Sequence, residues 1–594
     1  MSAALTPVLT AAEPGARYLA AIATDLPAPL VAQFDLLATA PGGVARLREL
    51  ILTLAVQGKL VPQHAGDEPA DVLLGRISAE KARLIANGEL KRGKPLPAID
   101  ESELPFALPA GWLWVRLGTL LQKIGAGSTP LGGKEVYVPS GVKFLRSQNI
   151  WDDGLRLDRV AFIKPETHAR MSGTIVLGND LLFNITGASI GRCAVVPSDF
   201  DEANVSQHVT IIRPVLATLD AFLHKVLVSR HVQQAVMDVQ VGVSREGLSI
   251  VKLANFLIPL PSLTEQSRIV ARVEELMRLC DALDAKGQLE AAQHAQLLGA
   301  LLGTLTDSTS PQALAEHWQR VAAHFDLLLD RPEAVDALEQ TILQLAVRGL
   351  LVPQDPNDEP ASVLLERIRA EKDRLITEGK IKRDKPLPAI SEGDAPFALR
   401  AGWQWARFSE LGNFGRGKSK HRPRNDPALF NPPRYPLIQT GEVARANGVI
   451  QEIHSMYSEV GLAQSRLWPA GTLCITIAAN IADAAVLGFD ACFPDSVVGF
   501  VPGSAIESVD YFLAFMETAR TRLIAFAPAT AQKNINLEVL GSLLIPLPPA
   551  CEMGRIVARV QELRRLCTNL RQRLAARQAT QAQLAQALVE AAAG

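Results

Sequence analysis

The sequence predicts an α+β protein: two mixed α/β domains separated by long antiparallel helical (coiled-coil) spacers, arranged as a pseudo-twofold internal repeat. The first observation behind this prediction is the repeat itself. Residues 34–112 align with residues 325–403 at a constant offset of 291, and 10 of 13 positions are identical between 51–63 and 342–354. A closing block recurs at an offset of 287, as 258–273 and 545–560, whereas the segments between the repeated blocks differ almost completely. The chain therefore presents two different surfaces on one repeated scaffold.

Each copy of the repeated frame begins with two predicted helices. In the first copy Leu47, Leu50, Ile51 and Leu54 follow the i, i+3, i+4, i+7 spacing of an amphipathic helix, and residues 338–345 follow it in the second. Glycines end these helices, at 58 and 349, and a second helix follows at 71–86 and at 362–377. Lys-Pro-Leu-Pro segments at 94–97 and 385–388 then indicate extended exits.

The regions between the frames consist of short apolar runs separated by glycine and proline, which is typical of mixed α/β domains with short strands. We call them variable domain 1 (residues 109–262) and variable domain 2 (residues 399–549). The predicted strands are 142–145, 174–177, 181–185 and 209–212 in the first, and 435–438, 473–477 and 496–501 in the second. Helical patches at 219–236 and 508–525 lie at matching places.

A long heptad-patterned helix follows each variable domain. Ile269, Val273, Leu276, Cys280 and Leu283 alternate by four and three residues, and so do positions 556–574. This spacing predicts the seam of a coiled coil, with a core-facing helix of a bundle as the alternative. Ser262 and Glu265 are spaced for a capping box, which Pro549 removes from the second copy.

These patterns divide the chain into five parts. They are an N-terminal helical region (1–108), variable domain 1 (109–262), a central helical spacer (263–398), variable domain 2 (399–549) and a C-terminal helix (550–594). We expect the C-terminal helix to pair with the N-terminal region, because together they supply the two parts that the central spacer contains alone.

Composition narrows the class of protein. No apolar run approaches the ~18 residues of a membrane span, and Met1–Ala12 lacks the basic start of a secretory signal. The six cysteines show neither C-x-x-C pairing nor zinc-ligand spacing with histidine, which favours a cytoplasmic protein without a metal site. The net charge of −2 excludes a uniformly basic nucleic-acid binder, yet residues 416–434 contain six Lys or Arg and one acid, a local charge of +5.

That basic segment contains Gly412-Asn-Phe-Gly-Arg-Gly-Lys-Ser419, which satisfies the phosphate-loop pattern G-x-x-x-x-G-K-[ST]. A phosphate loop needs a helix that begins at the lysine, but Pro423 and Pro427 interrupt any such helix. A P-loop NTPase using Lys418 is therefore an alternative hypothesis. The favoured interpretation is a basic loop that meets DNA, and a solvated loop without function is the plain alternative.

No Ser/His/Asp set and no other catalytic constellation stands out, which favours a binding or architectural protein. Polar residues able to read base edges recur in both variable domains, because Gln and Asn pair with adenine and Arg pairs with guanine. In variable domain 1 they are Arg146, Gln148, Asn149, Asn184, Thr186, Arg192, Gln207, His208 and Arg245. In variable domain 2 they are Arg416, Lys418, Lys420, Arg422, Arg424, Gln439, Thr440, Lys533 and Asn534.

The order of these features resembles the DNA-specificity subunit of type I restriction-modification systems. The resemblance rests on the duplicated frame, on residues 124–130, 182–192 and 244–248, and in the second half on 415–424 and 532–536. It spans nearly the whole chain and adds Ser128, Thr129, Ser419 and His421 to the expected DNA-binding residues. Residues 1–31 have no counterpart in the pattern.

The resemblance implies two target-recognition domains that each read one half of a split, asymmetric DNA site, with the helices setting the gap between the halves. It also implies two methyltransferase subunits and ATP-dependent restriction and translocase subunits as partners on double-stranded DNA. S-adenosylmethionine, ATP and magnesium would be bound by those partners, and this chain would be non-catalytic. A coiled-coil scaffold that does not bind DNA is the second alternative.

Overall fold

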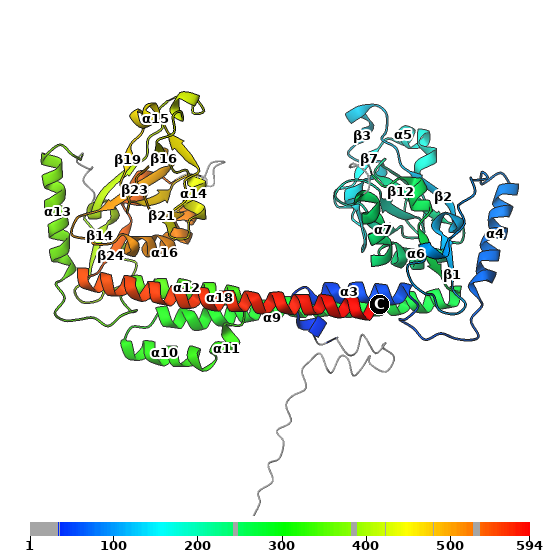
Figure 1. The fold of residues 1–594 in the computed structure, drawn as a ribbon, viewed down its shortest axis with the longest axis horizontal. Helices are drawn as coiled ribbons and strands as arrows, with labels where there is room; N and C mark the ends of the chain where they lie inside the picture. The colour runs from blue at the N-terminus through cyan, green and yellow to red at the C-terminus, as the bar shows by residue number, and fades with distance from the viewer. Residues whose placement is uncertain are drawn as a thin grey trace, which may run out of the picture. The chain divides into compact units, whose positions relative to one another are not determined.

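The computed structural model describes residues 34–593, apart from 35, 242–246, 382–388, 422, 479 and 527–534. The chain forms two compact units, each with one variable domain and part of the helical frame (Figure 1). Unit 1 is Met1–Leu289 with Arg577–Gly594, and unit 2 is Glu290–Ala576. The α+β fold class and the two domains with long helices are as predicted.

In unit 1 the frame helix α3 (Gly43–Val56) lies along the first part of the long helix α9 (Leu263–Thr306), whereas α4 (Ala70–Ala86) stands at the side of variable domain 1 (Figure 1). Ile269 and Val273 of α9 share one buried core with Leu50 and Leu54 of α3. The same core includes Ala585 and Val589, from the end of α18 (Ala550–Ala593). The heptad positions thus serve a helical bundle core and not only a two-helix seam.

In unit 2 the corresponding helices are α12 (Pro332–Val347) and α13 (Ala361–Thr377), with the first part of α18. Two further helices, α10 (Pro311–Ala323) and α11 (Phe325–Leu328), lie between the end of α9 and α12. Leu302 of α9, Leu338 of α12 and Leu574 of α18 belong to one buried cluster. A separate cluster joins Ile556 and Val560 of α18 to variable domain 2.

Each variable domain opens and closes on a single pair of antiparallel strands, which we call the neck. In unit 1, β1 (Leu113–Arg116) pairs with β13 (Leu257–Leu260), so that Trp114 lies opposite Pro259. In unit 2, β14 (Gln404–Arg407) pairs with β24 (Leu544–Leu547), so that Trp405 lies opposite Pro546. The repeated Pro-Leu-Pro block is therefore the closing strand of an inserted domain.

Variable domain 1 contains two larger sheets. An antiparallel sheet has the order β10-β9-β12-β2, and a mixed sheet has the order β3-β7-β4-β11-β8, in which β4 and β11 are parallel. The strands of the first sheet are β2 (Leu121–Ala126), β9 (Leu181–Asn184), β10 (Cys193–Val195) and β12 (Val209–Pro214). Those of the second are β3 (Tyr137–Val138), β4 (Val142–Leu145), β7 (Ala161–Ile163), β8 (Ile175–Val176) and β11 (Ala203–Val205). Helices α6 (Asp220–Leu227) and α7 (Arg230–Val241) pack against the first sheet through buried Phe222 and Val232.

Variable domain 2 repeats this plan with other sequences. Its larger sheet has the order β15-β23-β20-β21-β17, and the smaller has the order β18-β16-β22-β19, in which β16 and β22 are parallel. The larger sheet comprises β15 (Gly412–Arg416), β17 (Val449–Ile450), β20 (Leu473–Thr476), β21 (Ala484–Leu487) and β23 (Val497–Pro502). The smaller comprises β16 (Tyr435–Leu437), β18 (Ser455–Tyr457), β19 (Leu467–Trp468) and β22 (Ala491–Cys492). Helix α16 (Asp510–Phe526) packs on β21 of the larger sheet.

Two predicted details differ in the structure. The helical patch 219–236 is two helices, which break at Val228 and Ser229. The Ser262 hydroxyl accepts from the backbone N–H of Glu265, at 3.1 Å, but the Glu265 carboxylate accepts from Trp112 and Gln63 instead of reaching back to Ser262. Within the described ranges, no helix is long and apolar enough to cross a membrane.

Candidate nucleic-acid interface

Four loops of variable domain 1 converge at one end of its sheets. Strand β12 is antiparallel to both β2 and β9, so β2 and β9 end where β12 begins. The loop residues that meet at this end are 127 after β2, 185 after β9 and 208 before β12. Main-chain hydrogen bonds join them: Gly127 N–H donates to Val209 at 2.9 Å, and Ile185 N–H donates to His208 at 3.0 Å. Ser206 N–H donates to Leu145 at 2.9 Å, which brings in the loop after β4.

Variable domain 2 builds the same junction from unrelated residues. Gly417 N–H donates to Val497 at 2.9 Å, and Ile477 N–H donates to Ser496 at 3.0 Å. The loop after β16 joins through Ile438, whose N–H donates to Cys492 at 2.9 Å. The backbone scheme is thus shared by the two domains, while the side chains that it presents are different.

A glycine is required at the same point of each junction. A Cβ atom on Gly127 would overlap the carbonyl oxygens of Val205 and Ser206, and one on Gly417 would overlap those of Phe493 and Pro494. Only glycine allows the chain after the first sheet strand to approach the neighbouring chain this closely. Because Ser128 and Lys418 follow these glycines, their side chains lie at equivalent positions.

This geometry rules out the phosphate-loop alternative. Residues 412–416 form strand β15, whose backbone pairs with β23 from Gly412–Pro502 to Arg416–Val498. The amide of Lys418 donates to Phe493 at 3.1 Å, and the next helical turn is only Pro427–Leu429. Because residues 412–416 are extended, the amide of Lys418 is engaged and no helix begins at Lys418, these residues do not form the amide cradle of a phosphate loop. Gly417, which completes the phosphate-loop pattern in the sequence, is required because the backbone of residues 493–494 passes directly against it.

The structure places most of the predicted residues of variable domain 1 at its loop junction. Ser128, Thr129, Gln148, Gln207 and His208 are exposed, and Arg146, Thr186 and Arg192 are half-buried. The Thr186 hydroxyl and the imidazole of His208 are 2.6 Å apart, which fixes two of these loops to each other. Arg245 lies outside the described residues.

Asn149 and Asn184 are structural residues and not candidates for base contact. The Asn149 side chain is 2% exposed and bridges the N–H of Arg146 and the carbonyl of Arg156, at 3.0 and 2.8 Å. Asn184 is fully buried, and its Nδ2 donates to the Ser147 carbonyl at 2.9 Å. Both side chains instead shape the loop that carries Arg146 and Gln148.

In variable domain 2 the predicted residues also surround the junction. Arg416, Lys418, Lys420, Arg424 and Gln439 are exposed, whereas Ser419, His421 and Thr440 are half-buried. Gln439 and Thr440 form the start of α14 (Thr440–Arg445). Arg422, Lys533 and Asn534 lie outside the described residues. The Gln464 side chain, which was not predicted, accepts from the N–H groups of Lys420 and His421 at 2.6 and 3.1 Å and holds the basic loop.

The basic loop is only partly neutralised. Arg424 pairs with Asp495 at 3.3 Å, and His421 lies 2.8 Å from Asp426. The backbone N–H of Ala428 and the imidazole of His421 lower the pKa of the Asp426 carboxyl. Arg416, Lys418 and Lys420 make no ion pair with a carboxylate elsewhere in the described chain. These exposed cations are free to meet phosphate oxygens or guanine edges.

A polar cluster at each neck ties the domain to the frame, and nothing in the sequence apart from the repeat points to it. In unit 1 the Glu265 carboxylate accepts from Trp112 Nε1 at 2.9 Å and from Gln63 Nε2 at 2.6 Å. In unit 2 Glu552 accepts from Trp403 Nε1 at 3.0 Å. Burial raises the pKa of both carboxyls, which the indole N–H groups partly oppose.

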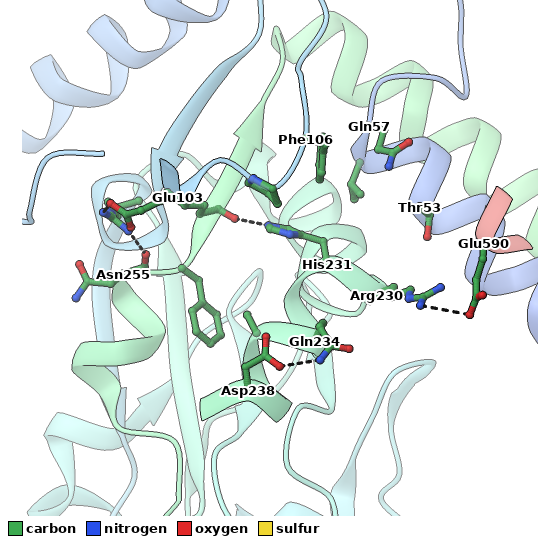
Figure 2. Close-up of a pocket in the computed structure, with 16 residues that line it drawn as sticks. Thr53, Gln57, Glu103, Phe106, Arg230, His231, Gln234, Asp238, Asn255 and Glu590 are labelled. Carbon is green, nitrogen blue, oxygen red and sulfur yellow. Dashed lines mark hydrogen bonds and ion pairs between the residues drawn. The ribbon is translucent and has the colours of Figure 1, made fainter. Parts of the chain in front are cut away.

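The neck of variable domain 1 also borders a cavity of about 640 Å³ (Figure 2). Its polar lining is largely paired internally: Arg116 contacts Glu103 at 2.8 Å, and His231 contacts the Leu257 carbonyl at 2.8 Å. Burial lowers the pKa of His231. The described chain contains no cluster of side chains suited to hold a metal ion. This cavity lies at the opposite end of β2 from the loop junction and shares none of its residues with that junction.

The comparisons with known proteins decide the family. A family model described as the type I restriction modification DNA specificity domain matches residues 109–293 and 401–577, together more than half of the chain. The chain belongs to the type I restriction-modification DNA specificity family. The two matched segments begin close to the two predicted variable domains, so this specificity subunit has two DNA-specificity domains.

Curated relatives of the specificity subunit cover nearly its whole length. It is 34% identical over 578 residues to the type I restriction enzyme EcoAI specificity subunit of Escherichia coli, covering 93% of this chain and 94% of that protein. It is 33% identical over 575 residues to the EcoEI specificity subunit of the same organism, with the same coverage. As a specificity subunit, it is a non-catalytic component of a restriction-modification complex and acts with DNA and the other subunits.

Solved structures are less similar. A chain from a structure on complex assembly and conformational transition of the type I R-M system has a TM-score of 0.49 and 19% identity, over 82% of this chain and 99% of that one. The HsdS subunit from Thermoanaerobacter tengcongensis has a TM-score of 0.39 and 19% identity, over 82% of this chain and 98% of that one. Both TM-scores are below 0.5, so the family assignment rests on the sequence matches.

Proposed function

We propose that each variable domain reads one half of a split, asymmetric DNA target through the loops gathered at its junction. The observation that supports this is the shared backbone junction carrying different side chains. In variable domain 1 the exposed groups include Gln148, Gln207 and His208, whereas variable domain 2 presents Arg416, Lys418 and Lys420. Because amides and guanidinium groups favour different base edges, the two halves of the target should differ in sequence.

The partners follow from the proposed task. We propose that two methyltransferase subunits and the restriction and translocase subunits assemble on the helical frame, on double-stranded DNA in the cytoplasm. Those subunits would bind S-adenosylmethionine, ATP and magnesium. The specificity subunit would then contribute the choice of sequence and the spacing between its halves.

A genome-wide map of methylated adenines, in the host with and without this gene, tests the proposal. We expect one split motif with two dissimilar halves and a fixed gap, which disappears when the gene is deleted. Complementation with a variant in which Arg416, Lys418 and Lys420 are replaced by alanine should weaken methylation of that motif. A methylation pattern that does not change on deletion would contradict the proposal.

A further inference from the structure

Variable domain 1 contains an aromatic residue with two guanidinium groups stacked on it. Trp151 lies in the hairpin formed by β5 (Ile150–Trp151) and β6 (Gly154–Leu155). The Cζ atom of Arg192 is 3.7 Å from the centre of the indole ring, and that of Arg156 is 3.8 Å from it. Two guanidinium groups this close to one ring cannot share a face without overlapping. They therefore lie on opposite faces of Trp151.

This stack is joined to the loop junction by hydrogen bonds. The Trp151 indole N–H donates to the Gln148 carbonyl at 3.0 Å. Asn149 donates to the Arg156 carbonyl at 2.8 Å, and the N–H of Asn184 donates to the Arg192 carbonyl at 2.9 Å. The two buried asparagines thus connect the stack to the strand ends that carry the loops. Both arginines stand beside the surface proposed to meet DNA.

Stacking on the ring leaves the N–H donors at the edges of each guanidinium group free. A cation over an aromatic ring interacts through the face of its plane, while the N–H donors point outward along the edges. Such a fork matches a phosphate group or the O6 and N7 atoms of guanine. Because the ring limits the rotation of both side chains, less conformational freedom is lost when they bind.

Nearby acids do not cancel both charges. Asp153 is 3.2 Å from Arg156, with both side chains at least half exposed, so this pair is weak and open to exchange. The Asp152 carboxylate accepts from the N–H of Cys193 at 3.0 Å. Burial raises the pKa of Asp152, against the opposing effects of that hydrogen bond and of Arg192. No ion pair closer than 4 Å engages Arg192 within the described residues.

Variable domain 2 has no equivalent two-sided stack among its described residues. There Arg466 lies 3.9 Å from the ring centre of Trp468, but that indole is fully buried. Phe493 stacks on Trp468 with ring centres 5.1 Å apart, so one side of the indole is taken by an apolar ring. The two-sided arrangement is therefore specific to variable domain 1.

We infer that Trp151 is a positioning residue of variable domain 1, which holds Arg156 and Arg192 for contact with acceptor atoms of the DNA half-site. The inference rests on the proposed function and adds to it the residues that carry the contact. The acceptors are phosphate oxygens or a guanine edge, and the two sources give different results in the same experiment. Neither Trp151 nor Arg156 stood out in the sequence, because no local spacing links them to Arg192.

The test uses the full chain assembled with its methyltransferase subunits and a duplex carrying the mapped target. Dissociation constants are measured between about 50 and 200 mM salt. Two duplexes are compared, the intact target and a target in which the half read by variable domain 1 is randomised. The variants are W151L, W151Y, R192A and W151L/R192A. We expect W151L and R192A each to weaken binding to the intact target about tenfold, the double variant to be no weaker than either, and W151Y to stay within about threefold. R83A, which removes an exposed arginine from α4, is the charge-matched control and should change binding less than about twofold.

Contacts to phosphate and contacts to guanine are distinguished by the salt dependence of binding and by the base preference. Loss of a phosphate contact lowers the salt slope by about 0.9 per contact, whereas loss of a guanine contact leaves the slope unchanged and relaxes the preference at one base pair. Additive losses in the double variant, no rescue by tyrosine, or unaltered binding by W151L would overturn the inference. If W151L fails to assemble, the inference is tested with R156A and R192A, which leave the indole in place. If the unmodified complex binds the intact and the half-randomised targets equally, the proposed function itself is contradicted, because variable domain 1 then reads no half-site.

Discussion

At the scale of single residues, Gly417 shows how a motif can be matched for another reason. Gly412–Ser419 satisfies the phosphate-loop pattern completely. In the structure the glycine before Lys418 is needed because the backbone of 493–494 passes directly against it. Gly127 meets the same constraint in variable domain 1, where no lysine follows. The requirement is a long-range approach, so it could not be read from local sequence.

Strand β15 and the residue that follows it offer a matched pair of glycines for a stability test. We expect Gly417→Ala to lower the free energy of unfolding by about 1–3 kcal/mol, because its Cβ would displace backbone carbonyls. The control is Gly415→Ala, whose Cβ would meet Trp468 at an ordinary 3.4 Å and should cost less than about 1 kcal/mol. Urea denaturation measures both, and equal losses would show that close approach at 417 is not the cause.

The predicted DNA-contact residues divide by burial in a way that sequence could not reveal. Gln148 and Asn149 are neighbours in a run of polar residues, yet the first is exposed and the second is 2% exposed. Residue type was informative, since both can read adenine, but exposure depends on how the loop folds. Trp151 was missed for a different reason, because its partner Arg192 is 41 positions away in the sequence.

At the scale of elements, the two halves of the frame use the same ion pair with its charges reversed. In unit 1 Arg48 of α3 pairs with Asp284 of α9 at 2.6 Å. The equivalent positions in unit 2 are Glu339 of α12 and Arg571 of α18, which pair at 2.8 Å. Exchanging the partners would place like charges together. The reversal therefore favours the pairing of each frame helix with its own long helix.

Moving the unit 2 arrangement into unit 1 tests this pairing rule. We expect D281T/D284R to lower the melting temperature at low salt, because the arginine introduced at position 284 would then face Arg48. Adding R48E should recover most of the loss by recreating the pair of unit 2, with an interaction of about 0.5–1 kcal/mol for such exposed side chains. High salt should shrink both changes. A D281T/D284R variant as stable as the natural chain would show that the pairing rule is wrong.

The longer helices and seven strand segments were predicted from the sequence, whereas the other strands and the pairing between strands were not. Periodicity predicts α3, α4, α12, α13 and the long helices, and the short apolar runs predict strands such as β4, β9, β12 and β20. The Pro-Leu-Pro blocks are evident as a repeat but not as closing strands, since proline seldom marks a strand. Parallel pairing of β4 with β11 joins Lys143 to Ala203, and local patterns cannot encode a contact between segments so far apart in the chain.

At the scale of the whole molecule, the two units share a frame, a neck and a junction, and differ where side chains face outward. The two units are most alike in the buried contacts that attach each domain, between Trp112 and Glu265 and between Trp403 and Glu552. They differ most in the loops. This division agrees with a subunit whose scaffold is held constant while its two DNA-reading surfaces change independently.

An exchange of one variable domain tests the division of labour between the two. Residues 109–262 are replaced by the corresponding domain of another specificity subunit, and the motif methylated by the assembled complex is mapped. We expect one half of the split motif to change, while the other half keeps its sequence. In the unexchanged chain, the R416A/K418A/K420A variant should weaken methylation of the motif and relax the sequence preference in the opposite half only. Retention of both original halves after the exchange, or the loss of both, would show that the variable domains do not each read one half of the target.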